Sequence, residues 1–213
     1  MEVVPAINAL DFKSALKTIA IAEEFLKKGD WLHLDVADGI FTASKTWRNA
    51  TEWANLRSQF KLEVHLMVEH PENCIEQWIA AGANRFIIHA ETLSKHMARQ
   101  IVARCKKRGI AVMLSSNPFT STKELWPLLP IFSHFQVLAV EPGFAGQKFI
   151  PIVCDKIKFL RNFAPNANIE VDGGVDDVIA KEVKKAGANI VVSASYIWNS
   201  KDPKRAYKKL KKI

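Results

Sequence analysis

Two histidines and two aspartates lie within or at the ends of short apolar runs, where side chains of these types could bind a metal ion. His33 and Asp35 are two residues apart, so in a strand both would point to the same face. His65 has a similar position in the next run, and Asp172 ends a later one. Two imidazoles and two carboxylates suit one divalent ion such as Zn, Mn, Fe or Co. These four residues are therefore the candidate ligands.

Small residues follow three of the later apolar runs, and loops of this kind could hold a phosphate group. Segment 141–147 contains two glycines, a Gly-Gly pair lies at 173–174, and Ser-Ala-Ser occupies 193–195. Free backbone N–H groups and a nearby helix N-terminus favour an anion. A tight structural turn explains any one of these loops equally well. The phosphate hypothesis therefore depends on the three loops together.

A repeated strand and helix pattern must position these residues. Short runs rich in Val, Ile, Leu and Phe alternate with longer segments of helical periodicity. Two helix-to-strand junctions share the sequence Ala-Gly-Ala-Asn, and glycine there can end a helix in the left-handed conformation. We predict strands at 3–7, 31–36, 61–67, 85–89, 110–115, 134–140, 168–172 and 189–193. Helices are predicted at 14–28, 71–81, 95–108, 151–163 and 177–186.

This pattern predicts an α/β fold, a (β/α)8 TIM barrel with eight parallel strands, formed by residues 1–213 as one domain. The alternative is an open, doubly wound sheet, which usually has about five or six strands and often a Gly-rich first turn. The first turn here reads AINALDF and contains no glycine. Because barrel chemistry occurs at the carboxyl ends of the strands, the candidate ligands and the small-residue loops would share one mouth.

The metal hypothesis depends on the whole set of ligands, because a single histidine in a strand is usually structural. Unpaired carboxylates are rarely buried, so polar groups converging on one barrel mouth need mutual pairing or a metal ion. His70, His89, His96 and His134 lack such company in the sequence. We interpret them as structural or surface residues.

Composition and charge favour an ordinary globular enzyme over a nucleic-acid or membrane protein. Hydrophobic residues make up 48% of the chain and charged residues 24%. Of the formal net charge of +8, a net +6 comes from segment 201–213, which has seven Lys or Arg and one Asp. Ala206, Leu210 and Ile213 recur there at helical spacing. The tail is therefore predicted to be an amphipathic helix with a solvated basic face.

The remaining sequence features favour a cytoplasmic protein. The N-terminus has no basic region followed by an apolar stretch, and no run of about eighteen apolar residues occurs. Cys74, Cys105 and Cys154 are far apart and form no C-x-x-C motif, so we expect buried, inert thiols.

At the residues that could do chemistry, the sequence resembles the ribulose-phosphate 3-epimerase family. The matching segments are WLHLDVADG at 31–39, EVHLMVEHPE at 63–72, EPGFAGQKFIP at 141–151 and IEVDGGV at 169–175. The resemblance implies one divalent metal ion as cofactor, and a reaction that interconverts D-ribulose 5-phosphate and D-xylulose 5-phosphate. We also expect a homo-oligomer.

The resemblance implies roles for individual residues. His33, Asp35, His65 and Asp172 would be the metal ligands, and the two aspartates would also be the acid/base pair on opposite faces of the sugar. One carboxylate would remove the proton next to the carbonyl, the metal would stabilise the enediolate, and the other carboxylate would return a proton. The residues that match the substrate- and phosphate-binding loops are Gly143, Phe144, Ala145, Gly146, Gly173, Gly174, Ala194 and Ser195. The loop containing residues 144–146 is expected to cover the substrate.

The sequence departs from the family at the same barrel mouth. Ala6 replaces a serine in a Pro-Ser-Ile-Leu segment, Ala37 a methionine, Ile40 a histidine and Ala194 a glycine, while Thr-Ala-Ser at 42–44 replaces Val-Pro-Asn. These changes affect substrate fit more than proton chemistry. The alternatives are therefore an epimerase of allulose 6-phosphate, a lyase that uses the same enediolate, and a non-catalytic barrel that binds a sugar phosphate or, through its tail, an acidic partner. We expect a small-molecule ketose phosphate as the ligand and no nucleic-acid or membrane partner.

Overall fold

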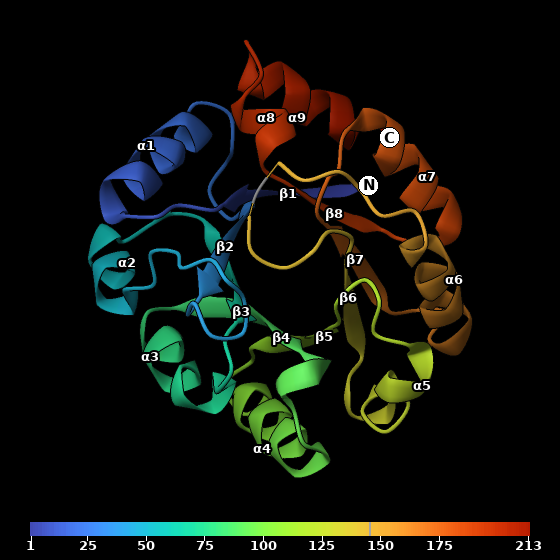
Figure 1. The fold of residues 1–213 in the computed structure, drawn as a ribbon. Coiled ribbons are helices and arrows are strands. Elements are labelled where there is room, and N and C mark those ends of the chain that lie inside the picture. Colours follow the sequence, from blue (N-terminus) through green and yellow to red (C-terminus); the bar gives the residue numbers. More distant parts are fainter. Residues whose placement is uncertain (145) are drawn as a thin grey trace.

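The strands of the computed structural model, which describes residues 1–144 and 146–213, close into one parallel barrel (Figure 1). They pair in sequence order, and the last strand pairs with the first. The predicted TIM barrel is therefore confirmed. The strands are β1 (Glu2–Ile7), β2 (Trp31–Ala37), β3 (Lys61–Met67), β4 (Ala83–His89), β5 (Ala111–Ser115), β6 (His134–Leu138), β7 (Asn168–Asp172) and β8 (Ile190–Ser193).

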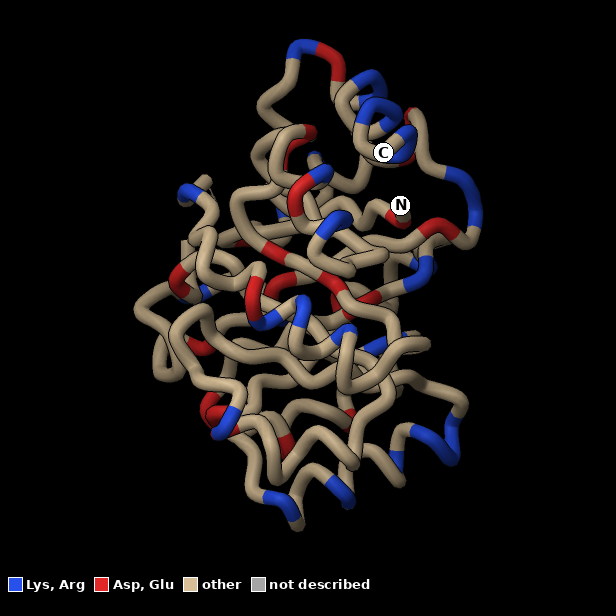
Figure 2. The backbone as a smooth tube through the Cα atoms, turned by 90° about the vertical axis from the view of Figure 1, so that its right-hand side faces the viewer, with Lys and Arg blue, Asp and Glu red and all other residues tan. Residues whose placement is uncertain are grey.

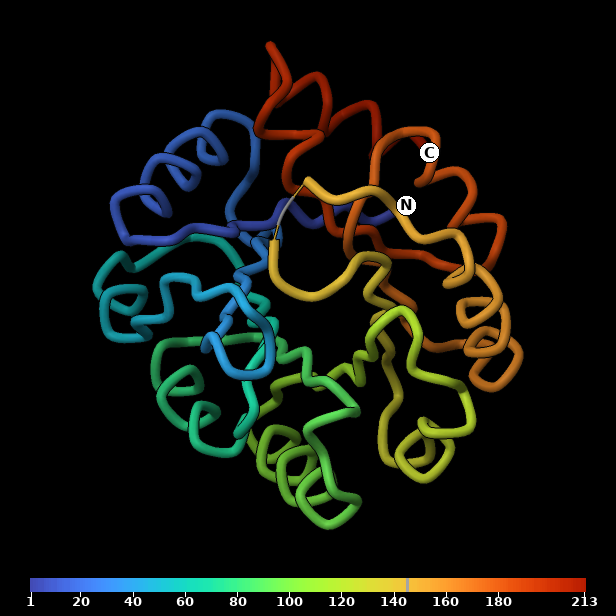
Figure 3. Tube along the Cα trace, in the orientation of Figure 1, coloured from blue at the N-terminus to red at the C-terminus, as the bar shows by residue number. Residues whose placement is uncertain are grey.

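Helices surround the barrel, and the chain runs once around it from the N-terminus to the C-terminus (Figures 1 and 3). Short 3-10 turns lie at Pro71–Asn73, Ala90–Thr92 and Leu129–Ile131. The helices are α1 (Phe12–Glu23), α2 (Ala50–Leu56), α3 (Ile75–Ala80), α4 (Lys95–Lys106), α5 (Thr122–Leu125), α6 (Val153–Phe163), α7 (Asp177–Ala186), α8 (Ser195–Trp198) and α9 (Pro203–Lys211).

Several boundaries differ from the prediction. Helix α1 begins earlier than expected because Asp11 caps it by accepting a bond from the backbone N–H of Ser14. The predicted helix at 71–81 divides into a 3-10 turn that begins at Pro71 and the shorter α3. Strand β6 ends at Leu138, and its ladder with β7 ends at the same place, in the pair of Leu138 and Asp172.

Helix α9 covers most of the predicted tail helix. Its buried residues include Ala206, Tyr207 and Leu210, and it packs against β1, α7 and α8. Its exposed residues include Lys204, Arg205, Lys208, Lys209 and Lys211, and Lys and Arg positions mark much of the chain near the C-terminus (Figure 2). Among residues 1–144 and 146–213, no helix has the length and apolar character needed to cross a membrane.

Side chains alternate along each strand between two buried regions, the layer between the barrel and its helices and the interior of the barrel. Outward-facing residues such as Leu34, Val64 and Phe86 are buried between the barrel and its helices. The intervening residues face the barrel axis, and many are polar although fully buried, such as His33 and Glu63. Because the barrel interior is polar, its side chains must be satisfied by one another or by a ligand.

Candidate metal centre and substrate cavity

The four candidate ligands meet at the carboxyl ends of the strands, as the barrel requires. The β2–β3 register places His65 directly beside Asp35, and Asp172 ends β7 across the mouth. Asp35 Oδ1 lies 3.1 Å from His33 Nε2 and 3.1 Å from His65 Nδ1. Asp172 Oδ2 lies 3.5 Å from His65 Nδ1 and 3.8 Å from His33 Nε2. One atom of each side chain therefore borders a common space.

The spacing of these atoms fits a divalent metal ion. One ligand atom from each of the four residues lies within 4.8 Å of all the others. A tetrahedral ion with bonds of about 2.0–2.1 Å would have its ligand atoms about 3.3–3.4 Å apart. The four distances between a histidine nitrogen and a carboxylate oxygen lie on both sides of that value. Small side-chain movements would be enough to hold the ion.

Burial and neighbouring charges oppose each other in this cluster. Burial raises the pKa of Asp35, but the hydrogen bonds and charges of His33 and His65 outweigh this effect and hold the pKa below its usual value. Burial lowers the pKa values of both histidines, and the adjacent carboxylates hold them above the usual value. The cluster therefore favours an ionised carboxylate beside positive charge.

Each candidate histidine ligand uses its second ring nitrogen for a contact with another buried residue. His33 Nδ1 lies 2.6 Å from Glu63 Oε1, and His65 Nε2 lies 2.9 Å from His89 Nε2. The interpretation of His89 as a residue without polar company was therefore wrong. Its place in a His-Ala-Glu segment at a strand end was the signal that could have identified it.

A charged network fills the barrel below the ligands. Arg85 contacts two buried carboxylates: its Nε donates to Glu63, and its Nη2 lies 3.4 Å from Glu170 Oε2. Gln136 Nε2 donates to Glu170 Oε1 at 3.1 Å. Burial and the nearby charge of Glu63 raise the pKa of Glu170 to about 8. The positive charge of Arg85 helps to hold the pKa of Glu63 below its usual value. Glu63 is therefore ionised and can accept a hydrogen bond from His33.

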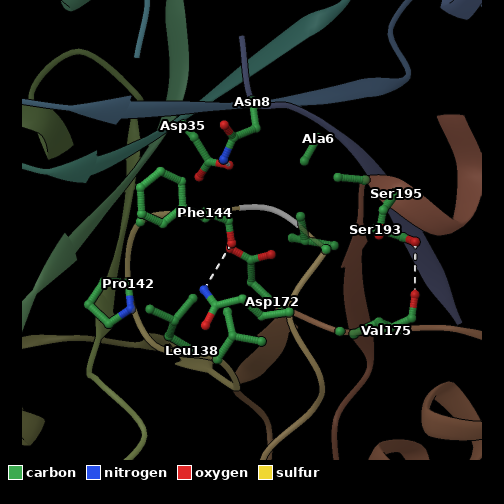
Figure 4. A pocket seen from close by; sticks show the side chains of 18 of the residues that line it. Ala6, Asn8, Asp35, Leu138, Pro142, Phe144, Asp172, Val175, Ser193 and Ser195 are labelled. Carbon is green, nitrogen blue, oxygen red and sulfur yellow. Dashed lines mark hydrogen bonds between the residues drawn. The ribbon is translucent and has the colours of Figure 1, made fainter. Parts of the chain in front are cut away.

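A cavity of about 540 Å³, part of it open to solvent, joins the two aspartates to the small-residue loops. Figure 4 shows Asp35 and Asp172 at one side of it and Ser193 and Ser195 at another. Of the predicted substrate-binding residues, Ala145 lies outside the described residues, and the others all line the cavity. The lining residues around the aspartates and loops are Ala6, Asn8, Asp35, Met67, Leu138, Val140, Pro142, Gly143, Phe144, Gly146, Gln147, Asp172, Gly173, Gly174, Val175, Val192, Ser193, Ala194 and Ser195.

Only some of the residues that differ from the family pattern face this cavity. Ala6 and Ala194 line it, whereas Ala37 is fully buried outside the lining and Ile40 is 69% exposed. Asn8, which the sequence reasoning did not select, also lines the cavity, beside Asp35 (Figure 4). Its side-chain amide donates to Asp35 Oδ2 at 3.2 Å. The carboxylate can only accept, so the amide nitrogen must face it.

The replaced segment at 42–44 contacts the loop after β6. Thr42 Oγ1 donates to the carbonyl oxygen of Pro142 at 2.7 Å, and Ser44 Oγ donates to that of Gly143 at 2.9 Å. These two hydroxyl groups connect the loop after β2 to the beginning of the loop that lines the cavity.

Known proteins resemble this chain in sequence and in fold. A family model described as the ribulose-phosphate 3 epimerase family matches residues 2–198. A ribulose-phosphate 3-epimerase of Helicobacter pylori (strain J99) is 35% identical over 222 residues, covering 100% of this chain and 98% of that protein. The cytoplasmic isoform from Oryza sativa subsp. japonica is 33% identical, covering 99% of this chain and 93% of that protein.

A solved 3-hexulose-6-phosphate synthase from Salmonella typhimurium shares the fold, with a TM-score of 0.72 and 16% identity over 100% of this chain and 97% of that one. At this identity the structural likeness shows the barrel alone, whereas the sequence matches extend over the segments that contain the four candidate ligands. The chain belongs to the ribulose-phosphate 3 epimerase family.

Proposed function

We propose that this protein is a metal-dependent epimerase that interconverts D-ribulose 5-phosphate and D-xylulose 5-phosphate. Membership of the family supports an isomerase that epimerises a pentose phosphate. The observation that carries the finer proposal is the meeting of two carboxylates, Asp35 and Asp172, with two imidazoles in one cavity. A binding protein has no need of two opposed carboxylates beside its ligand.

The two aspartates would move the protons. One carboxylate takes the proton from the carbon next to the carbonyl, and the electron pair of the C–H bond moves onto the carbonyl oxygen. The other aspartate, protonated, gives its proton to the opposite face of the same carbon, so the configuration is inverted. Asp35 and Asp172 come from β2 and β7, which are not adjacent, and this separation suits attack from two sides.

His33, Asp35, His65 and Asp172 would hold the metal ion, which fits their donor atoms and spacing. When bound, the ion would supply positive charge for the substrate oxygens that become negative during proton transfer. The chemistry of the set is compatible with Zn, Mn, Fe or Co, and the choice among them stays a prediction.

The phosphate group would lie against the loops after β6, β7 and β8. Gly173 and Gly174 both have positive φ, of 105° and 66°, and their backbone lines the cavity. Ala194 and Ser195 border the same space at the start of α8. Small residues let an anion approach the backbone N–H groups closely.

An epimerase of allulose 6-phosphate is the second candidate. The observation that favours it is Ala6, which lines the cavity and lacks the hydroxyl group that the family usually has there. Removing a polar contact near the sugar changes which ketose fits best.

The test is conversion of ribulose 5-phosphate to xylulose 5-phosphate by metal-loaded protein in D2O, with deuterium entering at C3. Asp35→Asn and Asp172→Asn should each lower kcat by at least about 100-fold, since each removes a proton-transfer group. Asp155→Asn, at an exposed position on α6, is the matched control and should retain activity. A metal-loaded protein without turnover and without exchange would refute the proposal, and faster turnover of allulose 6-phosphate would favour the second candidate.

Further expectations accompany this function. Four expectations stay predictions: a single domain over 1–213, a homo-oligomer, a cytoplasmic location, and a basic face of the tail helix that is solvated and binds no partner. Tight nucleic-acid binding that is lost when the tail is deleted, by a protein that binds no metal, would instead favour the non-catalytic alternative.

A further inference from the structure

A line of hydrogen bonds runs from the surface of the barrel mouth to one candidate metal ligand. Glu91 Oε2 lies 3.3 Å from His89 Nδ1, and His89 Nε2 lies 2.9 Å from His65 Nε2. The remaining nitrogen of His65, Nδ1, faces both Asp35 and Asp172. Both imidazoles are fully buried, whereas the side chain of Glu91 is 22% exposed.

The direction of these bonds determines where the protons are. A carboxylate only accepts hydrogen bonds, so His89 must donate through Nδ1–H to Glu91. In a neutral ring the other nitrogen is then an acceptor, so His89 Nε2 accepts from His65 Nε2–H. Nε2 of His65 therefore carries a proton whatever the charge of its ring, and Nδ1, which faces the two aspartates, is the nitrogen that can bind a metal ion once it has lost its proton. The carboxylate thus selects, through one ring, the tautomer that can bind a metal through Nδ1.

We propose that Glu91 and His89 are positioning residues that hold His65 in the tautomer required of a metal ligand, an inference that rests on the proposed metal site. A carboxylate behind a histidine ligand commonly fixes the orientation of the ring and raises its basicity. Here the carboxylate acts through a second histidine instead of directly.

Packing holds this line of groups in place. Glu91 Oε1 accepts from the backbone N–H of Asn117 at 2.8 Å and from the hydroxyl group of Thr120. The ring centroid of His89 lies 4.7 Å from that of Phe41 and 5.1 Å from that of the nearly parallel ring of His65. The carboxylate is therefore fixed by the loop after β5, and the ring has little freedom to rotate.

The other candidate histidine ligand provides an internal comparison. His33 faces the aspartates through Nε2, and its Nδ1 contacts Glu63 directly at 2.6 Å. The two histidines therefore use opposite ring nitrogens for the metal, and each needs the opposite tautomer. A carboxylate fixes the proton in both cases, once directly and once through His89.

Glu91→Gln is the informative substitution, because it keeps the shape of the side chain and reverses one hydrogen bond. The amide oxygen would remain with the two donors of the loop after β5, so the amide NH2 group would face His89 Nδ1. His89 would then have to donate through Nε2, and His65 would have to carry its proton on Nδ1. We expect the affinity for Zn²⁺ to fall by about 10- to 100-fold.

Glu72→Gln is the matched control. Glu72 is also two residues after a histidine, and its Oε1 lies 3.4 Å from His70 Nδ1, but that ring is mostly exposed and contacts no candidate ligand. Affinity for Zn²⁺ would be measured by competition with a chromophoric chelator. Side-chain ¹⁵N NMR of the metal-free proteins would show whether Nε2 of His65 carries a proton.

The outcomes separate the inference from the proposed function. A proton on Nε2 of His65 in the wild-type protein, with weaker Zn²⁺ binding in Glu91→Gln alone, supports the inference. Equal affinities of Glu91→Gln and wild type, or a His65 Nε2 without a proton in the wild type, would overturn it while the metal site stands. A wild-type protein that binds no divalent metal would overturn the metal site itself, and the inference with it.

Discussion

Gly174 lies where the loop after β7 meets the loop after β6, and replacing it by alanine gives the sharpest test of the phosphate site. Its φ of 66° is in the left-handed region. An added Cβ would lie 2.5 Å from the backbone nitrogen of Phe149 and 3.1 Å from the carbonyl oxygen of Gln147. These neighbours are main chain and cannot rotate away. The following residue, Ile150, is held by its N–H bond to the carbonyl oxygen of Ala139 at 2.8 Å.

The expected loss of stability in Gly174→Ala has two parts. A non-glycine residue in the left-handed conformation costs about 1–2 kcal/mol. Moving the backbone near Phe149 by several tenths of an ångström costs about 1–3 kcal/mol more, as overpacking in well-packed regions does. Gly174→Ala should therefore lower the free energy of unfolding by about 2–5 kcal/mol. Gly82 also has a positive φ, of 89°, but no described atom lies within 4 Å of its added Cβ. Gly82→Ala should cost only the first part.

Urea denaturation of both variants would measure these free energies, and isothermal titration with inorganic phosphate and with ribulose 5-phosphate would measure binding. We expect Gly174→Ala to weaken phosphate binding by at least about tenfold, since the shifted loops line the cavity, and Gly82→Ala to leave it unchanged. Losses of stability that agree within about 0.5 kcal/mol, or unchanged phosphate affinity in Gly174→Ala, would refute this reasoning.

Three further predictions concern Asn8, Ser44 and Lys156. Asn8→Leu removes the donor to Asp35 Oδ2, so kcat/KM should fall about tenfold in the epimerase assay, and an unchanged value would contradict a role for that hydrogen bond. Ser44→Ala removes the bond to the carbonyl oxygen of Gly143 and should cost about 1 kcal/mol in urea denaturation and raise KM; an unaltered KM would separate this contact from substrate binding. Burial lowers the pKa of Lys156 to about 8 from 10.5, so protonation opposes folding below pH 8, and this cost disappears as pH rises towards 10.5. The unfolding free energy of wild type relative to Lys156→Met should therefore rise by up to about 3 kcal/mol across that range, and parallel pH profiles would contradict it.

The sequence by itself determined the strand and helix repeat and the residues that could take part in chemistry. Helix α7 has the predicted bounds, because Asp176 caps its start and Gly187, with φ of 118°, ends it. Strand β7 likewise coincides with its apolar run. Signals of this kind are local: a periodic pattern, a capping side chain or a glycine acts within a few residues. The candidate ligands were also evident, since polar residues among apolar neighbours at strand ends are conspicuous.

Only the tertiary structure decided how distant residues pair. Arg85 lies between Glu63 and Glu170 because three strands present them to the same axis, and Asn8 meets Asp35 because β1 and β2 are in register there. His89 was interpreted as a structural or surface residue, because its partner His65 is 24 residues away in the sequence. Hydrogen bonds across strands depend on register and closure of the barrel, which no local pattern encodes. The candidate ligands could therefore be selected from the sequence, whereas the groups that contact them became evident only in the structure.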